Sequence, residues 1–164
     1  MKTTFIGVKM AQTPRAVALW EQVLSEIGFK RIIEFGSYKW GMSLLFFLFA
    51  LKQGAEFYTY DIGKFTPPRV VRQVGVNKHF KMVDVFSIEK DIGELIKKDG
   101  ITVIYCDGGD KQRELDTFSK YMKKGDYIAV HDWGTEATLA PRFLNEVFSK
   151  ECDEEGMTRI FQYA

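Results

Sequence analysis

The sequence predicts an α/β fold built on one doubly wound parallel sheet, and three observations indicate it. Apolar segments of strand length alternate along the chain with segments of helical periodicity, as in repeated strand–helix–strand units with right-handed crossovers. The expected strands are short and apolar without clean alternation, which is typical of a parallel sheet covered on both faces. An acidic residue stands at or near the end of five of these strands, and in such a sheet those ends share one edge, where ligands bind.

The first half of the chain predicts three strands and three helices of this sheet. Thr13 is expected to cap a helix that Pro14 begins and Gly28 ends, with apolar residues at helical spacing between them. The apolar run Leu44 to Leu51 predicts a helix buried on nearly all sides. Strands are expected at 31–35, 57–60 and 80–83, helices at 14–27, 41–52 and 67–74, and a further short strand at 3–8.

The second half of the chain continues the alternation. Ser87 is expected to cap one helix, and Gly100 lies beyond its end. Helices are expected at 87–98, 112–122 and 140–148, and strands at 102–106, 127–130 and 158–163. The main sheet is therefore expected to have about six strands.

Composition restricts the class of protein. The 164 residues suit one domain over 1–164, and 46% apolar residues predict a globular chain. A net charge of +1 and a pI near 7.7 give no reason to expect nucleic acid as a partner. The longest apolar run is too short to cross a bilayer, and no signal-peptide pattern is present, so no membrane partner is expected. Cys106 and Cys152 lack the spacing of a metal site or disulfide framework, which predicts a reducing, cytoplasmic compartment.

The stretch RIIEFGSYKWGMS, residues 31–43, predicts a ligand-binding turn between a strand and a helix. Glu34 stands near the end of the strand, and Gly36 allows close approach of the backbone to a ligand. Ser37, Tyr38 and Gly41 lead into the helix, whose first N–H groups can act as donors. The full G-x-G-x-x-G spacing is missing, so pyrophosphate binding is only weakly supported.

Two further strand ends add parts that suit a nucleoside. Asp61 lies about 20 residues beyond Gly41, where a carboxylate can accept both ribose hydroxyls, a feature that also fits nicotinamide cofactors. Asp84 offers a carboxylate for an exocyclic amine, and Val85 and Phe86 offer apolar contacts for a base. Together these parts suit adenosine without a pyrophosphate. Ordinary turn and cap chemistry is the alternative for each aspartate.

The ends of the next two strands carry a second group of polar residues. Asp107-Gly108-Gly109-Asp110-Lys111 follows one strand and His131-Asp132 follows the next. The first segment alone could be a plain Asp-Gly turn, but the nearby His131-Asp132 pair favours a site. His131 could be a metal ligand, a base or a hydrogen-bonded residue of the edge.

The pattern E-F-G-S-Y-K-W-G-M-S with Asp61, Asp84, C-D-G-G-D-K and H-D-W resembles the class I S-adenosylmethionine-dependent methyltransferases. It is similar to the small metal-dependent O-methyltransferases and to the cephalosporin-hydroxylase and rhamnosyl O-methyltransferase group, over roughly residues 10–135. The resemblance implies that the turn at Gly36 holds the methionine part of S-adenosyl-L-methionine, that Asp61 binds the ribose, and that Asp84 with Phe86 binds the adenine. The expected cofactor contacts are Glu34, Gly36, Ser37, Tyr38, Gly41, Asp61, Asp84, Val85, Phe86 and Asp107.

The resemblance also implies a reaction, in which a methyl group passes to an oxygen of a small-molecule or sugar acceptor. Asp107 and Asp132 match the family's metal-ligand positions, with His131 as a further candidate, and Mg or Mn there would lower the pKa of the acceptor hydroxyl. Lys111, Asp110 or His131 would take or steer the proton. A non-catalytic adenosyl-binding module or partner subunit, and a nicotinamide-dependent oxidoreductase, are the alternatives.

Three departures from the family pattern carry expectations of their own. Trp40 stands where the family has a glycine, so it is expected to intrude on the methionine pocket. His131 stands where relatives often have an acid or a small residue. The family's seventh strand is expected to be absent, which would leave the last strand beside the fifth or at an exposed edge, and a homodimer is expected to cover that edge.

Overall fold

A computed structural model of the chain describes residues 3–164. The strands of its large sheet are β3 (Arg31–Phe35), β4 (Glu56–Asp61), β5 (Phe80–Met82), β6 (Thr102–Cys106), β7 (Tyr127–Val130), β8 (Leu144–Val147) and β9 (Arg159–Tyr163). The α-helices are α1 (Pro14–Glu26), α2 (Gly41–Gln53), α3 (Arg69–Val74), α4 (Glu89–Lys97), α5 (Lys111–Phe118) and α6 (Ser149–Glu155). Short 3-10 helices η1 (Val76–His79), η2 (Val85–Ile88) and η3 (Ser119–Tyr121) complete the central region.

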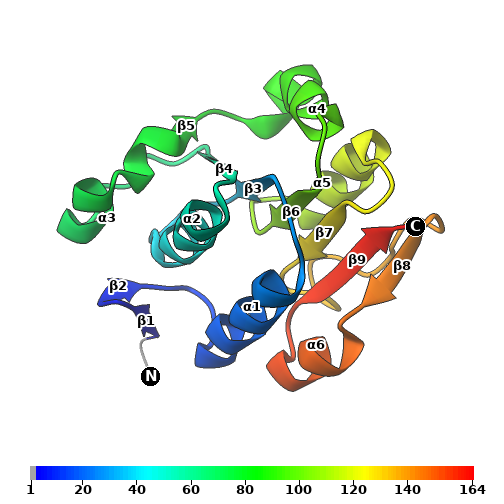
Figure 1. Cartoon of the computed structure of the whole chain (residues 1–164), viewed down its shortest axis with the longest axis horizontal. Helices are drawn as coiled ribbons and strands as arrows, with labels where there is room; N and C mark the ends of the chain where they lie inside the picture. The colour runs from blue at the N-terminus through cyan, green and yellow to red at the C-terminus, as the bar shows by residue number, and fades with distance from the viewer. Residues whose placement is uncertain (1–2) are drawn as a thin grey trace.

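The predicted α/β architecture is confirmed: seven strands lie in the order β5-β4-β3-β6-β7-β9-β8 between layers of helices (Figure 1). The first five strands of that order are parallel, and β9 is antiparallel to both of its neighbours. The chain starts in the middle of the sheet at β3, runs outward to β5, and returns to β6. The switch between β3 and β6 is where a doubly wound sheet places its ligand.

Two apolar cores cover the two faces of this sheet. Helices α1, α2 and α6 lie on one face, and α4 and α5 lie on the other (Figure 1). The first half of α2 is buried as predicted, but Leu51 near its end is 65% exposed, so the helix is not surrounded on all sides. Across residues 3–164, no helix is both long and apolar enough to cross a membrane.

The end of the chain departs from the prediction in two ways. The segment expected to be a helix at 140–148 instead contains β8, which pairs along its length with β9 from Leu144↔Tyr163 to Val147↔Ile160. A seventh strand is therefore present, and the expectation of its absence was wrong. β8 covers the outer edge of β9, so the exposed last strand that motivated a homodimer does not occur. Non-local pairing outweighs a weak local helical pattern here.

Smaller departures concern boundaries. The short strand expected at 3–8 is a hairpin of β1 (Thr4–Phe5) and β2 (Val8–Lys9), because Ile6 and Gly7 both adopt positive φ and turn the chain. Ser87 does not cap α4. Asp84 instead accepts the N–H of Phe86 at 3.0 Å and begins η2, and α4 follows at Glu89. The helix expected at 112–122 ends as α5 at Phe118 and continues as η3.

Candidate active site

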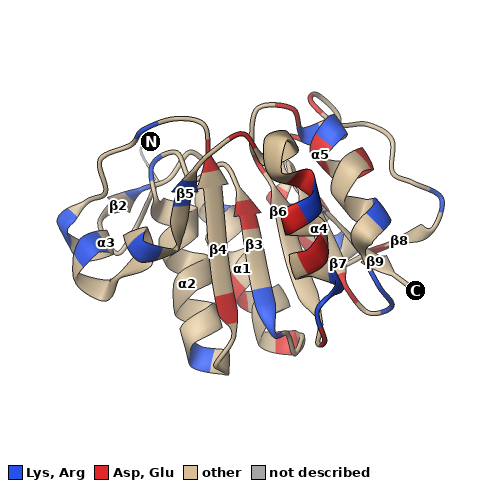
Figure 2. Ribbon diagram, turned by 90° about the horizontal axis from the view of Figure 1, so that it is seen from above, with Lys and Arg blue, Asp and Glu red and all other residues tan. Residues whose placement is uncertain are grey.

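Acidic residues gather at the carboxyl ends of the parallel strands, as predicted, and red segments mark the arrowheads of β3 and β4 in Figure 2. A cleft of about 300 Å³ opens there, bounded by the segments that follow β3, β4, β5 and β6. A smaller cavity of about 130 Å³ adjoins it on the side of the N-terminal segment, and Gly36 lines both. The first turn thus lies where two adjoining spaces meet.

Gly36 and Gly41 are glycines because other parts of the chain approach them closely. Gly36 has φ +93°, and a Cβ there would lie 2.1 Å from the carbonyl oxygen of Asp107. A Cβ on Gly41 would lie 2.5 Å from the carbonyl oxygen of Lys9 and 2.2 Å from the Met10 side chain. The sequence interpretation assigned this freedom to a ligand. The structure shows that it also closes the turn against the loop after β6 and against the N-terminal segment.

Trp40 does not intrude on either cavity. Its backbone adopts φ +71° and begins α2, and its indole is 2% exposed and lies edge-on to Phe80 at 5.1 Å. Tyr38, two residues earlier, also has positive φ, and its exposed ring packs against Phe65. Tyr38 and Trp40 both adopt a positive φ, which is uncommon for residues other than glycine. With this backbone the Trp40 side chain lies in the core and the Tyr38 side chain lies toward the solvent.

Glu34 lies beneath the turn and not in the cleft. Its Oε2 accepts hydrogen bonds from Ser43 Oγ at 2.5 Å and Thr59 Oγ1 at 2.6 Å, and Ser37 Oγ lies 2.7 Å from Thr59 Oγ1. Burial raises the pKa of Glu34 to about 8, against the two hydroxyl donors, which lower it. Glu34 therefore belongs to a buried network that supports Ser37 from below, and the structure does not bring it to the cavity surface.

Asp61 and Asp84 both line the larger cavity, where the sequence placed them. Asp61 accepts the N–H of Tyr38 at 3.0 Å and that of Gly63 at 2.8 Å, so it joins the first turn to the end of β4. Asp84 accepts the N–H of Phe86. Each carboxylate oxygen can accept more than one hydrogen bond, so these turn roles leave acceptors free for a ligand.

Phe86 and Val85 form the apolar end of the same cavity. The Arg113 guanidinium lies 3.8 Å from the centroid of the Phe86 ring, and the Phe118 ring is stacked with that ring at 6.1 Å. An aromatic wall of this kind suits a flat base.

Glu114 is a residue that sequence reasoning missed. It is buried, it lines the larger cavity, and its Oε2 accepts the N–H of Gly108 at 3.3 Å. Burial raises its pKa to about 7. The sequence does contain a signal for Glu114. It stands next to Leu115 and four residues before Phe118, so it is an acidic residue on the apolar face of a helix that starts at the predicted site.

A second group of side chains converges at the ends of β6 and β7. Potential ligand atoms of Asp107, His131 and Asp132 all lie within 4.8 Å of one another. Asp107 Oδ2 accepts hydrogen bonds from Gln12 and, at 3.4 Å, from Tyr105, so its Oδ1 is the oxygen that faces the group. Gln12 and Asp107 are 95 residues apart in the sequence, so this contact could not be predicted from local pattern.

His131 is the residue of this group with unmet hydrogen-bonding capacity. It is 5% exposed, and neither ring nitrogen has a hydrogen-bond partner of acceptable geometry among the described residues. Nδ1 lies 3.4 Å from Asp107 Oδ1 and 3.2 Å from Asp132 Oδ2, close enough for electrostatic attraction alone. Burial lowers the pKa of His131, but the two carboxylates outweigh burial and the net shift is upward.

Lys111 lies inside the group, while Asp110 lies outside it. Lys111 Nζ contacts Glu136 Oε2 at 2.6 Å and Asp132 Oδ2 at 3.1 Å. Burial lowers the pKa of Lys111, but Glu136, Asp107 and Asp132 outweigh it and raise the pKa, so the amine holds its proton and is a poor base. Asp110 caps α5 through the N–H of Arg113 at 3.1 Å and lines the larger cavity.

The donors of this group fit a divalent cation. Two carboxylates and a buried imidazole with unpartnered nitrogens offer oxygen and nitrogen ligand atoms that lie within 4.8 Å of one another. Oxygen ligands suit Mg or Mn, and the imidazole favours a softer ion. Asp107, Asp132 and His131 are therefore the residues that would hold a metal.

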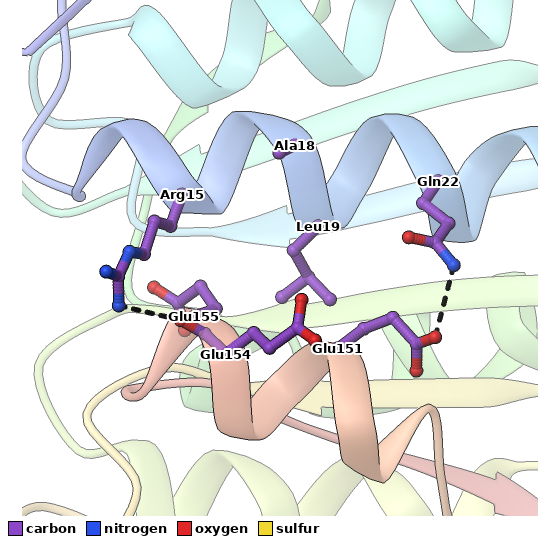
Figure 3. A pocket seen from close by; sticks show the side chains of 7 residues that line it. All are labelled: Arg15, Ala18, Leu19, Gln22, Glu151, Glu154 and Glu155. Atoms are coloured by element: carbon purple, nitrogen blue, oxygen red, sulfur yellow. Dashed lines mark hydrogen bonds between the residues drawn. The ribbon is translucent and has the colours of Figure 1, made fainter.

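A further cavity, of about 350 Å³, lies between α1 and α6 (Figure 3). It is lined by Arg15, Leu19 and Gln22 from α1 and by three glutamates of α6, and Gln22 is hydrogen-bonded to Glu151 across it. None of the residues predicted from the sequence lines it. The space separates two helices on the outer side of the sheet, so the cleft at the strand ends remains the candidate site.

Comparisons with known proteins agree with this fold. The family model described as Rhamnosyl O-methyltransferase/CmcI matches residues 1–150. No curated protein matches the chain. The fold is similar to CmcI-N160 with SAH, at 14% identity and TM-score 0.63, over 96% of this chain and 81% of that chain.

Two more structures share the fold. CmcI-D160 with Mg and SAM is 15% identical with TM-score 0.54, over 79% of this chain and 57% of that one, so this chain spans little more than half of it. An RNA methyltransferase from Salinibacter ruber in complex with S-adenosyl-L-homocysteine is 14% identical with TM-score 0.54, over 94% of both chains. At such low identities the likeness shows the fold alone.

Proposed function

Because the chain belongs to the rhamnosyl O-methyltransferase/CmcI family, we propose that it transfers the methyl group of S-adenosyl-L-methionine to a hydroxyl oxygen of a small-molecule or sugar acceptor. One observation carries the proposal. The larger and the smaller cavity adjoin at Gly36, and the group of Asp107, His131 and Asp132 lies beside that junction. A nucleoside in the larger cavity would therefore direct its methionine part toward the smaller one, with the sulfonium near Asp107.

The cofactor would use the following contacts. Asp61 would accept hydrogen bonds from the ribose hydroxyls, and Asp84 would accept one from the exocyclic amine of the base. Phe86 and Val85 would cover the base. Ser37, Tyr38 and Gly41, with Gly36, line the smaller cavity or its rim, where the methionine part would lie.

The chain would accelerate the reaction mainly by positioning. Methyl transfer is an in-line displacement, so the acceptor oxygen must lie opposite the sulfur across the methyl carbon. A cation on Asp107, Asp132 and His131 would lower the pKa of the acceptor hydroxyl when bound. Gln12 and Tyr105 bind Oδ2 of Asp107 and leave its Oδ1 facing Lys111 and His131. Because Lys111 keeps its proton, it would orient oxygen atoms and would not remove the proton.

Both alternatives remain testable. A nicotinamide-dependent oxidoreductase is supported by the position of Asp61, and a non-catalytic adenosyl-binding module by the raised pKa of Lys111, which removes one candidate base. Calorimetry with S-adenosylhomocysteine and with NAD separates the first alternative. Binding of NAD but not of S-adenosylhomocysteine would contradict the proposal.

Turnover separates the second alternative. Purified protein would be incubated with S-adenosylmethionine, a hydroxyl-compound library and either Mn²⁺ or a chelator. Formation of S-adenosylhomocysteine that depends on an added acceptor supports methyl transfer, and binding of the cofactor without turnover across the library favours the module.

The domain organisation, the oligomeric state and the cellular location stay predictions. We propose that residues 1–164 form one domain. The homodimer was predicted because β9 was expected to have an open edge, but β8 pairs with that edge, and light scattering would test the oligomeric state. Cys106 and Cys152 are free and buried, which supports a reducing, cytoplasmic compartment.

A further inference from the structure

Lys111 places its ammonium group where a divalent cation would bind. Nζ lies 3.1 Å from Asp132 Oδ2 and 3.6 Å from Asp107 Oδ1. The same two oxygens face His131 Nδ1 at 3.2 and 3.4 Å. The carboxylate oxygens that a metal would share with His131 are therefore already in contact with a cation that belongs to the chain.

Asp107 has no second oxygen to offer in exchange. Its Oδ2 accepts hydrogen bonds from Gln12 and Tyr105, which are both buried, Gln12 in the segment before α1 and Tyr105 within β6. Oδ1 alone remains for a cation. An ammonium group and a metal ion that need the same oxygen also repel each other at short range in a site screened from water, so they compete.

Glu136 gives Lys111 a second position. It makes the shortest contact of the ammonium group, 2.6 Å, and its side chain is 52% exposed, whereas that of Lys111 is 6% exposed. Glu136 lies on the segment after β7, outside the group of candidate ligands. A lysine side chain is long and flexible. The ammonium group can therefore keep Glu136 while it leaves Asp107 and Asp132.

We propose that Lys111 is a built-in competitor of the divalent cation, which holds the position between Asp107 and Asp132 and withdraws to Glu136 when a metal binds. This rests on the proposed function, because it needs the metal site. Lys111 neutralises the half-buried carboxylates of Asp107 and Asp132 in the absence of metal and makes metal loading reversible. It is a positioning residue of the metal site and not a base.

The test is a titration of MnCl₂ into the full chain by calorimetry. Lys111→Met removes the charge and keeps most of the length of the side chain, and its Mn²⁺ dissociation constant is expected to fall at least about tenfold. Lys120→Met, at an exposed lysine of η3, is the matched control and is expected to leave the constant unchanged. Equal or weaker Mn²⁺ binding by Lys111→Met overturns the competitor role. If Lys111→Met fails to fold by circular dichroism, Lys111→Gln replaces it with the same expectation.

Glu136→Gln tests the withdrawal. It is expected to raise the Mn²⁺ dissociation constant about threefold or more in the native background and to have no effect in Lys111→Met, because Glu136 acts through Lys111. A Glu136→Gln effect that persists in the Lys111→Met background overturns this role.

Titration with S-adenosylhomocysteine distinguishes failure of the competitor role of Lys111 from failure of the proposed methyl transfer. Absence of Mn²⁺ binding in every variant, with S-adenosylhomocysteine still bound, overturns the competitor and leaves methyl transfer standing. Mn²⁺ binding with the expected Lys111 effect, but no S-adenosylhomocysteine binding, supports the competitor and overturns the proposed function.

Discussion

At the adenosyl end of the cleft, Asp61 and Asp84 accept hydrogen bonds from backbone N–H groups of their own turns, whereas at the cation end Asp107 and Asp132 face the side chains of Lys111 and His131. Backbone donors are neutral and fixed, so the first pair of carboxylates keeps acceptor capacity for a neutral ligand. The second pair faces two buried side chains, Lys111 and His131, and electrostatic interactions are stronger where water is excluded.

One edge of a sheet can therefore carry two kinds of acidic site. Position at a strand end is common to all four aspartates and is readable from the sequence. The partner of each carboxylate is not, because it depends on which neighbouring segment comes close. The first pair is suited to recognising a ligand and the second to holding a cation, and each of the following changes tests that separation.

The largest expected effect comes from Asp107→Asn together with Asp132→Asn. Loss of the cation site should lower methyl transfer at least about 1,000-fold, and a chelator should have the same effect on the native protein until Mg²⁺ or Mn²⁺ is restored. Affinity for S-adenosylhomocysteine, measured by calorimetry, should change less than about tenfold, since Asp61 and Asp84 are untouched and only Asp107 of the changed pair lines the smaller cavity.

Two results would contradict the separation of the cation end from the adenosyl end. Full activity in the presence of a chelator would remove the metal from the reaction. A parallel collapse of S-adenosylhomocysteine affinity in a folded double variant would show that the two ends are one site.

The second effect concerns Glu34, which lies beneath the turn between the two ends. Its pKa is raised from 4.5 to about 8 by burial, so the folded protein holds a proton that the unfolded chain releases. This contribution to stability is complete below pH 4.5 and is lost as the pH rises toward 8, by on the order of 3 kcal/mol after allowance for relaxation of the site. Glu34→Gln should remove that dependence.

Urea unfolding at several pH values between 5 and 9 measures it. The stability of Glu34→Gln should exceed that of the native protein increasingly as the pH rises. Glu21→Gln, at an exposed position of α1, is the control. Parallel pH profiles for the native protein and Glu34→Gln would show that Glu34 is ionised in the folded state.

The third effect is specific to the adenosyl end. Asp61→Ala should weaken S-adenosylhomocysteine binding by about 1–3 kcal/mol, because two charge-assisted hydrogen bonds to the ribose would be lost. Mn²⁺ affinity should not change. Asp99→Ala, at an exposed aspartate before β6, is the control for charge alone. Unchanged calorimetric affinity in folded Asp61→Ala would leave Asp61 with its turn role only.

The smallest effect concerns the wall of the base pocket. Arg113 covers one face of Phe86, and Arg113→Gln should reduce S-adenosylhomocysteine affinity by roughly 0.5–1 kcal/mol through a less ordered aromatic wall. Arg69→Gln, at the exposed start of α3, controls for the loss of one positive charge. An equal effect of both substitutions would assign the change to net charge and not to the contact with Phe86.

Much of the fold and the position of the cleft could be predicted from the sequence, because both depend on local sequence patterns. Strand–helix alternation predicted the parallel sheet, glycines marked the turn after β3, and acids at strand ends located the cleft. These features depend on periodicity and turn chemistry within a few residues. The same reasoning placed Asp107, His131 and Asp132 on neighbouring strand ends, and the structure brings their ligand atoms together.

The remaining features could not be predicted from the sequence, because each depends on contacts between segments that are far apart along the chain. β8 is a strand because β9 pairs with it, although its local pattern suggested a helix. Glu34 is buried and accepts hydrogen bonds from Ser43 and Thr59, and Gln12 reaches Asp107 from the segment before α1. Burial and partner choice set the charge of a group, and neither is encoded in its immediate neighbours. For that reason the sequence could name Lys111 as a functional residue, but only the three carboxylates around its ammonium group show that it holds its proton.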